Sequence, residues 1–278
     1  KHELDYLEFV SDEVELLERF KEIIIDYKPD VLTGYFTDGF DFPYIKVRAE
    51  KYKIKLNVGL DNSEMKMKKG KIPLTEITGI AHIDVFRFVK RIFRTTFTSF
   101  KLNDVAKELL DEEKVEVDLE NLYTAWNEEN GELEKFAEYN LQDAKLTYDL
   151  CVKLMPNIIE FTKMIGLTPA ELSRMSFSQL VEWYLMKEAP EFNELAPNRP
   201  EFGEERKRRM ESYEGGYVYE PTPGLYENIA VFDFRSLYPT IISAHNISPD
   251  TIIHGQDSED GVLKGVSFGK AKKGFIST

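Results

Sequence analysis

The chain has 278 residues, a length that allows one large domain or two of ordinary size. With 42% hydrophobic and 31% charged residues it has the composition of a globular protein, too apolar for disorder and too charged for a bundle of membrane helices. The single cysteine, Cys151, excludes an intramolecular disulfide and argues against a structural zinc site. The net charge of −14 argues against a protein that coats nucleic acid, but it suits an enzyme that gathers carboxylates around divalent metals.

The first hundred residues predict alternating helices and strands. The first helix begins near Ser11 or Asp12, carries apolar residues at helical spacing and ends at Pro29. In chain order, the expected elements are a helix (12–28), a strand (30–36), a turn and a helix (44–54), a surface hairpin or loop (61–80), a strand (79–86) and a helix (87–94). This order favours α/β or α+β layers over a pure helical bundle.

The remainder of the chain is predicted to be mainly helical before it returns to a strand. We expect helices near 101–111, 118–128 and 132–155, the last ending before Pro156, and a further helical region at 157–190. The Pro-rich stretch 194–205 is typical of a linker. A turn-rich segment then leads into ENIAVFDF (227–234), which predicts a strand.

The most informative segment is VFDFRSLYPTII (231–242). Asp233 follows the apolar run IAVF, and a carboxylate at the end of a buried strand is costly unless it is paired or bound to a cation. The RSLYP turn after it offers backbone amides, which suit phosphate oxygens. Two interpretations remain open on the pattern alone: a metal–triphosphate site, or a strand-end Asp that caps the next helix.

Several segments occur in the order of one known family. VFDFRSLYPTII followed by HNISPDT resembles motif A of family B DNA polymerases, in particular of the archaeal replicative type. SYEGGYVYEP resembles the family's YxGG segment, and LVEWYL with NELAPNRP resembles the stretch before it. YNLQDAKLTYDL and GYFTDGFDFPYI resemble the third and second motifs of the attached 3′–5′ exonuclease domain. The resemblance covers nearly the whole chain, and several motifs in order are far more specific than any one of them.

In the exonuclease part, the resemblance assigns Asp41 and Asp143 to the metals and Tyr139 to orienting the attacking water. Tyr139 and Asp143 are four residues apart and therefore share one helical face. Two-metal hydrolysis uses carboxylates to bridge cations about 3.5–4 Å apart. Without the resemblance, Asp143 reads as an ordinary exposed carboxylate and Tyr139 as a packing residue. Phe40 keeps the family's place beside Asp41 and is expected to contact DNA.

The second exonuclease motif departs from the family at two positions. Phe36 stands where the family usually has Asn, and Gly39 replaces a more common Asn. Loss of polar contacts to the primer end could weaken proofreading, although Asp41 is retained.

In motif A, the resemblance implies that Asp233 ligates both catalytic metals and that the Phe234 carbonyl completes one metal shell. Ser236 and Leu237 would offer amides to the triphosphate. Tyr238 would lie under the deoxyribose and exclude a 2′-hydroxyl by steric clash.

The YxGG-like segment implies contact with single-stranded template through Tyr213, Gly215 and Gly216; a simple β-turn is the alternative. A basic patch (205–210) precedes it and favours template contact. A second basic stripe (Arg87, Lys90, Arg91 and Arg94) could track a nucleic-acid backbone, but the pattern favours a solvated helix face.

The sequence therefore predicts a mixed α/β (α+β) chain in three parts. These are an RNase-H-like exonuclease domain without its first motif (1–155), a helical connector (156–212) and the start of a palm domain (213–278). The expected function is that of a template-directed DNA polymerase with 3′–5′ proofreading. The alternatives are a stand-alone exonuclease and an inactivated structural subunit. The chain resembles a middle segment of such a polymerase and is expected to be inactive alone, because each site lacks carboxylates.

The resemblance also implies the cofactor and the partners. Two-metal sites with Mg²⁺ are expected, with Mn²⁺ able to substitute. The partners are primer–template DNA, deoxynucleoside triphosphates and a sliding clamp bound through other parts of the protein, with no membrane. The implied location is the cytoplasm of an archaeal cell, in association with the nucleoid.

Overall fold

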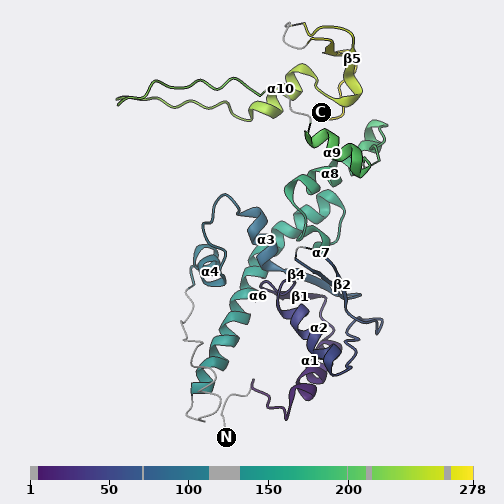
Figure 1. Cartoon of the computed structure of the whole chain (residues 1–278), viewed down its shortest axis with the longest axis vertical. Coiled ribbons are helices and arrows are strands. Elements are labelled where there is room, and N and C mark those ends of the chain that lie inside the picture. Colours follow the sequence, from purple (N-terminus) through teal and green to yellow (C-terminus); the bar gives the residue numbers. More distant parts are fainter. Residues whose placement is uncertain are drawn as a thin grey trace. The chain divides into compact units, whose positions relative to one another are not determined.

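A computed structural model of the chain describes residues 6–70, 72–112, 132–198, 200–210, 215–259 and 264–277. These residues belong to two compact units, Lys1–Tyr184 and Leu185–Thr278, each of which contains helices and strands (Figure 1). The mixed α/β class is as predicted. The three-part division of the chain stays a prediction, and the expected helix at 118–128 lies outside the described residues.

The first unit contains most of the helices and the parallel strand pair. Its elements are α1 (Glu13–Tyr27), β1 (Val31–Gly34), α2 (Asp41–Lys51), β2 (Lys66–Lys68), β3 (Leu74–Glu76), β4 (Ala81–Asp84), α3 (Val85–Ile92), α4 (Leu102–Leu110), α6 (Glu132–Ile165) and α7 (Pro169–Leu172). Helix α8 (Phe177–Glu188) crosses into the second unit. The predicted surface hairpin is present, because β2 and β3 pair antiparallel.

Strands β1 and β4 pair in parallel, with Val31 opposite Ala81 and Gly34 opposite Asp84. Parallel strands end at the same edge of a sheet, so the loop after β1 and the start of α3 meet at one place. This edge also receives Asp41, the first residue of α2, because only the residues 35–40 separate β1 from α2. The sequence predicted α2 to begin at residue 44; it begins three residues earlier and includes the candidate metal ligand.

Two hydrophobic clusters fill the first unit. One joins β4, α3, α4 and α6 around fully buried residues such as Ile83, Val89 and Leu150. The other packs α1 and α2 against the residues that flank the β2–β3 hairpin, around side chains such as Leu17, Ala49 and Ile77.

The prediction that a helix ends before Pro156 was wrong, since α6 continues to Ile165 with Pro156 inside it. Leu154 and Ile158, on either side of this proline, are buried in the same cluster. We attribute the continuity to this shared burial, which offsets the hydrogen bond that a proline cannot donate.

The second unit is smaller and is organised around α10 and a short hairpin. Its elements are η2 (Ala189–Phe192), α9 (Phe202–Met210), α10 (Leu237–His245), η3 (Pro249–Thr251), β5 (Ile252–His254) and β6 (Val266–Phe268). Asn246 follows α10 with a positive φ and donates its amide to the carbonyls of Gly269 and Lys272 at 2.6 and 2.8 Å. The HNISPDT segment thus ties the end of α10 to the residues that follow β6.

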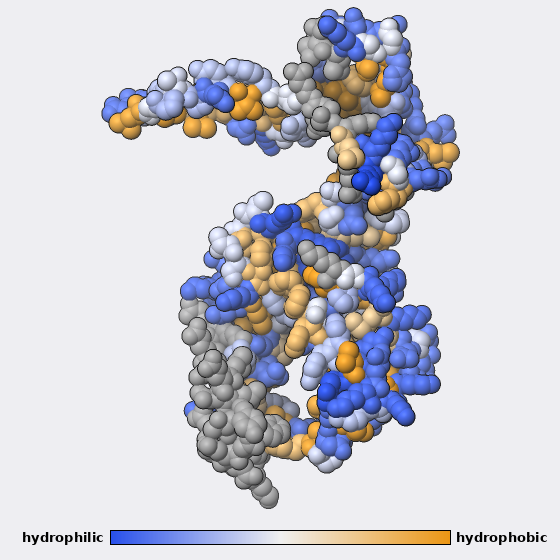
Figure 2. All heavy atoms as spheres, in the orientation of Figure 1, coloured by the Kyte–Doolittle hydropathy of each residue, from blue (hydrophilic) through white to orange (hydrophobic). Residues whose placement is uncertain are grey.

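The predicted strand ENIAVFDF was not confirmed. Residues 215–235 run as an extended segment into α10 without strand pairing among the described residues. Figure 1 shows this segment as a long extension, and Figure 2 shows apolar side chains along it. Val231 and Phe232 are 89% and 93% exposed. The apolar run IAVF favours a strand, but a strand forms only where a neighbouring strand supplies hydrogen bonds, and the described residues supply none here.

Over the described ranges, no helix combines the length and the apolar character needed to cross a lipid bilayer.

Candidate functional site

The loop between β1 and α2 carries the second exonuclease-like motif. Its backbone closes into a turn, in which the N–H groups of Gly39 and Phe40 each donate to the Phe36 carbonyl at 3.0 Å. The turn continues into α2, since the Phe42 N–H donates to the Thr37 carbonyl at 3.1 Å. Asp41 is exposed at the first position of α2, and desolvation by the surrounding protein raises the pKa of its carboxyl.

Asp84, the last residue of β4, anchors the backbone of this loop. Its carboxylate accepts from the Phe36 N–H at 2.9 Å and from the Asp38 N–H at 3.1 Å. The side chain has no exposed surface. Burial raises the pKa of Asp84 to about 6, although the two backbone donors work in the opposite direction.

Asp38 anchors the same loop through its side chain. The carboxylate is 0% exposed and accepts from the Thr75 N–H at 2.8 Å, from Arg87 Nη1 at 3.0 Å and from Arg174 Nε at 3.2 Å. Burial alone would raise its pKa, but the Arg174 guanidinium, the Thr75 N–H and the other neighbouring charges hold the pKa below its usual value. Asp38 is therefore a buried structural anion and is not available as a metal ligand.

His82 completes this cluster from β4. Its Nδ1 lies 2.8 Å from Arg174 Nη2, and its Nε2 lies 2.9 Å from the Thr37 hydroxyl. A guanidinium can only donate, so Nδ1 accepts and Nε2 carries the proton that it donates to Thr37. Burial lowers the pKa of His82 to about 4, which keeps the imidazole neutral at pH 7.

The two departures from the family pattern are sterically linked. Phe36 has a φ of 64°, a left-handed conformation that suits Asn and is strained for a bulky residue. Its ring packs edge-on against Phe86, with centroids 4.9 Å apart. A Cβ built at position 39 would lie 2.3 Å from the Phe36 ring, so the ring fits only over a glycine. Any side chain at position 39 would therefore displace the Phe36 ring from this position.

An exposed aromatic pair lies beside Asp41. Phe40 is 62% exposed and stacks on Tyr44, with ring centroids 6.0 Å apart and an interplanar angle of 12°. Exposed aromatic rings of this kind can stack on bases of a single strand. Tyr35 is not part of this surface, because its hydroxyl donates to the Phe100 carbonyl at 2.7 Å in a partly buried position.

Tyr139 and Asp143 lie on α6, as the sequence predicts. Tyr139 is half-buried, and the Oδ1 atom of Asp143 is buried. Helix α6 packs against β1, which leads into the loop that carries Asp41. Among the described residues, however, no group of three or more His, Cys, Asp or Glu side chains is arranged to hold a metal ion. The described residues therefore do not assemble a complete ligand set from the predicted carboxylates.

The motif A residues lie where the extended segment meets α10. Asp233 and Phe234 are exposed on the extended segment, and Tyr238 is 79% exposed in the first turn of α10. Ser236 precedes the helix with a φ of 52° and makes no side-chain cap. The amides of Ser236 and Leu237 are thus at a helix N-terminus, where an anion would be favoured. The alternative prediction that Asp233 caps this helix gains no support from the structure.

Of the YxGG-like segment, Tyr213 lies outside the described residues. Gly215 and Gly216 are exposed, and a Cβ at either position would meet no atom within 4 Å. Their predicted role in template contact stays a prediction.

The basic stripe on α3 is not a simple solvated face. Arg87 is largely buried and donates to Asp38 and to the Pro73 carbonyl. Lys90 lies over the Phe86 ring, with Nζ 5.0 Å from its centroid, and Arg94 follows the end of α3.

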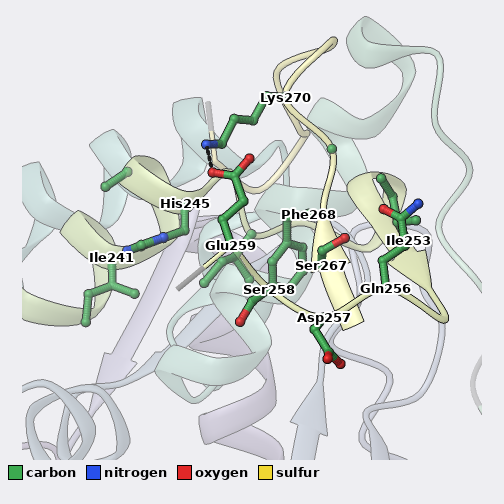
Figure 3. A pocket seen from close by; sticks show the side chains of 13 residues that line it. Ile241, His245, Ile253, Gln256, Asp257, Ser258, Glu259, Ser267, Phe268 and Lys270 are labelled. Carbon is green, nitrogen blue, oxygen red and sulfur yellow. Dashed lines mark hydrogen bonds and ion pairs between the residues drawn. The ribbon is translucent and has the colours of Figure 1, made fainter. Parts of the chain in front are cut away.

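The second unit contains a hollow of about 860 Å³ (Figure 3). It is lined by the far end of α10, the β5–β6 hairpin and the stretch 256–259, where Lys270 Nζ lies 2.5 Å from a Glu259 oxygen. None of the predicted nucleotide-binding residues lines it.

Comparisons with known proteins match two separate stretches of the chain. A model described as the exonuclease domain of DNA polymerase family B matches residues 2–105. A second model, described as DNA polymerase family B, matches residues 172–274. The chain belongs to the family B DNA polymerases. The predicted resemblance is confirmed, and the exonuclease domain that residues 2–105 match fits an RNase-H-like fold.

Archaeal relatives match almost the entire chain. It is 43% identical over 279 residues to a DNA polymerase of Pyrococcus horikoshii, and this alignment covers 99% of this chain and 22% of the relative. It is 42% identical to DNA polymerase 1 of Pyrococcus abyssi, with 99% of this chain and 36% of the relative covered. The solved family B DNA polymerase of Pyrobaculum calidifontis aligns with a TM-score of 0.72 at 30% identity, over 96% of this chain and 35% of that chain. The chain thus spans about a fifth to a third of the relatives it matches.

The buried cluster around Asp38 was missed by sequence reasoning. Asp38 and Arg174 are 136 positions apart, and no local pattern links them.

Proposed function

We propose that the protein is a template-directed DNA polymerase that removes mismatched nucleotides by 3′–5′ exonuclease action. The observation that carries this proposal is the anchored loop 36–41, which presents Asp41 beside an exposed aromatic pair, in a chain that matches both the exonuclease and the polymerase part of one family.

In the exonuclease reaction, we assign Phe40 to stacking on a base at the unpaired primer end. Asp41 and Asp143 would supply carboxylate oxygens, and Tyr139 would orient the attacking water. The raised pKa of Asp41 suits a carboxyl that is poised in partly desolvated surroundings and gains from a nearby cation.

Divalent metals are the family's general cofactor, and we propose Mg²⁺ in particular. Carboxylate oxygens are the donors that Mg²⁺ prefers, so the chemistry of Asp41, Asp143 and Asp233 fits. The described residues gather no group of three such ligands, so a complete cage needs ligands beyond them. When bound, the metals would activate water or the primer hydroxyl and steady the leaving oxygen.

In the polymerase reaction, we assign Asp233 to the metals together with the Phe234 carbonyl. The amides of Ser236 and Leu237, at the start of α10, would meet the triphosphate. The exposed ring of Tyr238 would pack against the deoxyribose and reject a 2′-hydroxyl.

The proposed partners are primer–template DNA, deoxynucleoside triphosphates and a sliding clamp. Gly215 and Gly216, with Tyr213, would contact the template. A location at the DNA in the cell interior follows from these substrates.

The test is a primer-extension and primer-degradation assay on the full-length protein, with one labelled primer that ends in a mismatch. Supply of Mg²⁺ alone should shorten the primer from its 3′ end, and supply of nucleotides should then extend it. A protein that does neither would contradict the proposal, and one that only shortens the primer would be an exonuclease without synthesis.

A further inference from the structure

We infer that Arg174 is a positioning residue for the exonuclease reaction, because it holds the loop 36–41 that carries Phe40 and Asp41. The inference rests on the proposed function. Arg174 lies in the stretch that matches the polymerase model (172–274), whereas the loop that it contacts lies in the stretch that matches the exonuclease model (2–105).

Arg174 connects three separate parts of the first unit. Its Nε donates to the Asp38 carboxylate at 3.2 Å, and its Nη2 donates to the Thr75 carbonyl at 2.7 Å and to His82 Nδ1 at 2.8 Å. One guanidinium thereby fixes the loop to both the β2–β3 hairpin and β4. A planar fork of donors can satisfy three acceptors in fixed directions, whereas an ammonium group sets no such directions.

Arg174 is itself held rigidly. It follows α7, whose start is fixed by a reciprocal capping box between Thr168 and Glu171. Leu172 is fully buried in the first hydrophobic cluster, and α7 packs against α6 and β4. The guanidinium therefore projects from a short, well-anchored segment.

The link from Arg174 to Asp41 is short and continuous. Asp38 lies within the turn whose backbone bonds join Phe36 to Gly39 and Phe40. Thr37 is tied to His82 through its hydroxyl, and His82 is tied to Arg174. A shift of Asp38 must therefore move the start of α2, where Asp41 stands. Misplacement of a reacting group by about 1 Å can cost about 100-fold in rate.

Burying the charged groups of this cluster costs free energy, and we attribute the cluster to its effect on the position of the loop. Burying Asp38 with two arginines removes several charged groups from water, and apolar side chains of similar volume would often stabilise a protein as well. What apolar side chains would not supply is a fixed direction for the loop. We therefore expect the loss of Arg174 to lower the rate of editing more than it alters the binding of DNA.

The experiment measures steady-state degradation of a single-stranded primer, and extension of a paired primer, by the full-length protein. Arg174→Gln should lower the exonuclease kcat about 10- to 100-fold with KM and extension nearly unchanged. Arg174→Lys should recover only part of the lost kcat, because it restores the charge without the fork. The matched control is Arg48→Gln, which removes an arginine that pairs with Glu13 between α1 and α2 and touches none of the cluster. It should retain the parent kcat.

A second variant covers the case in which Arg174→Gln does not fold. Thr37→Val keeps the shape of the side chain and removes only the bond to His82; it should lower kcat about 3- to 10-fold with KM unchanged. Parent kcat in folded Arg174→Gln, or in Thr37→Val if the first variant does not fold, would overturn the inference. So would equal losses in exonuclease and extension, or full rescue by lysine. If the parent protein itself does not degrade the primer, it is the proposed function that fails.

Discussion

The loop 36–41 and the segment 229–238 both carry residues assigned to metal binding, but they differ in burial and in the number of contacts that hold them. The loop is fixed by buried partners from β4, the β2–β3 hairpin and the segment after α7. The segment around Asp233 is extended and exposed, with Val231 and Phe234 largely in solvent.

This difference separates two ways of positioning a carboxylate. The position of Asp41 is fixed by the hydrogen bonds that hold the loop 36–41 within the described residues of the first unit. The described residues of the second unit provide no comparable contacts to the segment around Asp233. Precision in catalytic sites usually comes from such supporting contacts. The exonuclease motif is thus pre-organised locally, and motif A depends on what packs against the extended segment.

We expect the largest effect from loss of Asp233, the candidate metal ligand of the exposed segment. Asp233→Ala in the full-length protein should reduce nucleotide incorporation at least about 10³-fold, because the carboxylate assigned to hold the catalytic metals is lost. Primer degradation should be unchanged. Primer extension and degradation by the same preparation provide the measurement, and undiminished extension would remove Asp233 from its assigned role.

The converse substitutions are made in the first unit. Asp41→Ala or Asp143→Ala should reduce removal of a mismatched 3′ end by about 10²- to 10³-fold and spare synthesis. The check is the release of the terminal nucleotide from a mismatched primer, with a paired primer as the control for synthesis. A parallel fall in synthesis would show that the two sites are not separate.

Tyr238 tests whether the exposed start of α10 acts on the sugar. Tyr238→Ala should relax discrimination against ribonucleotides by about 10- to 100-fold, because the ring no longer occupies the space of a 2′-hydroxyl. Tyr238→Phe should keep the discrimination, since it retains the ring. The ratio of kcat/KM for deoxy- and ribonucleotides measures this, and equal ratios in Tyr238→Ala and the parent would exclude the steric role.

The pairing of Phe36 with Gly39 tests the local fixation of the loop. Gly39→Asn should destabilise the chain by about 1–3 kcal/mol, because its Cβ would overlap the Phe36 ring. Combining it with Phe36→Asn should restore most of this loss, since Asn tolerates the left-handed φ and vacates the space. Urea unfolding of the two single variants and the double variant gives the coupling; strictly additive effects would contradict it.

The smallest effect concerns pH. The raised pKa of Asp84, about 6, means that the folded chain keeps a proton there, so its contribution to the unfolding free energy falls as pH rises from about 4 to 6. The lowered pKa of His82, about 4, has the opposite effect, and its contribution rises with pH over about 4 to 6.5. The lowered pKa of Asp38 matters only below about pH 4. The parent chain should therefore show little net dependence from these groups.

Single substitutions should reveal the two opposed contributions. Asp84→Asn should leave stability rising with pH over this window, and His82→Gln should leave it falling, each by about 1–3 kcal/mol. Unfolding curves at pH 4.5 and pH 6.5 are the measurement. Slopes of the same sign in both variants would contradict the assignment.

The sequence predicted what depends on local pattern. Apolar spacing and Asp12 as a cap gave α1, and the Asp12 side chain does accept from the Glu15 N–H at 2.9 Å. The motifs placed Tyr139 and Asp143 on one helix, as observed, whereas Asp41 was expected in the turn before a helix and is the first residue of α2.

The sequence predictions that the structure did not confirm concern features that depend on contacts between residues far apart in the chain. Pro156 was interpreted as a helix end because local rules ignore the buried cluster that Leu154 and Ile158 join. ENIAVFDF was read as a strand although strand pairing is supplied by other segments. The Arg174 cluster was invisible because its members come from the loop, β4, the hairpin, α3 and the segment after α7.

Hydrogen–deuterium exchange on the 278-residue chain at pH 7 tests the contrast between the two regions most directly. The account predicts slow exchange at the amides of Phe36 and Asp38, which donate to the buried Asp84 carboxylate, and fast exchange over residues 229–235. Equal protection of both regions, or faster exchange in the loop than in the extended segment, would contradict it.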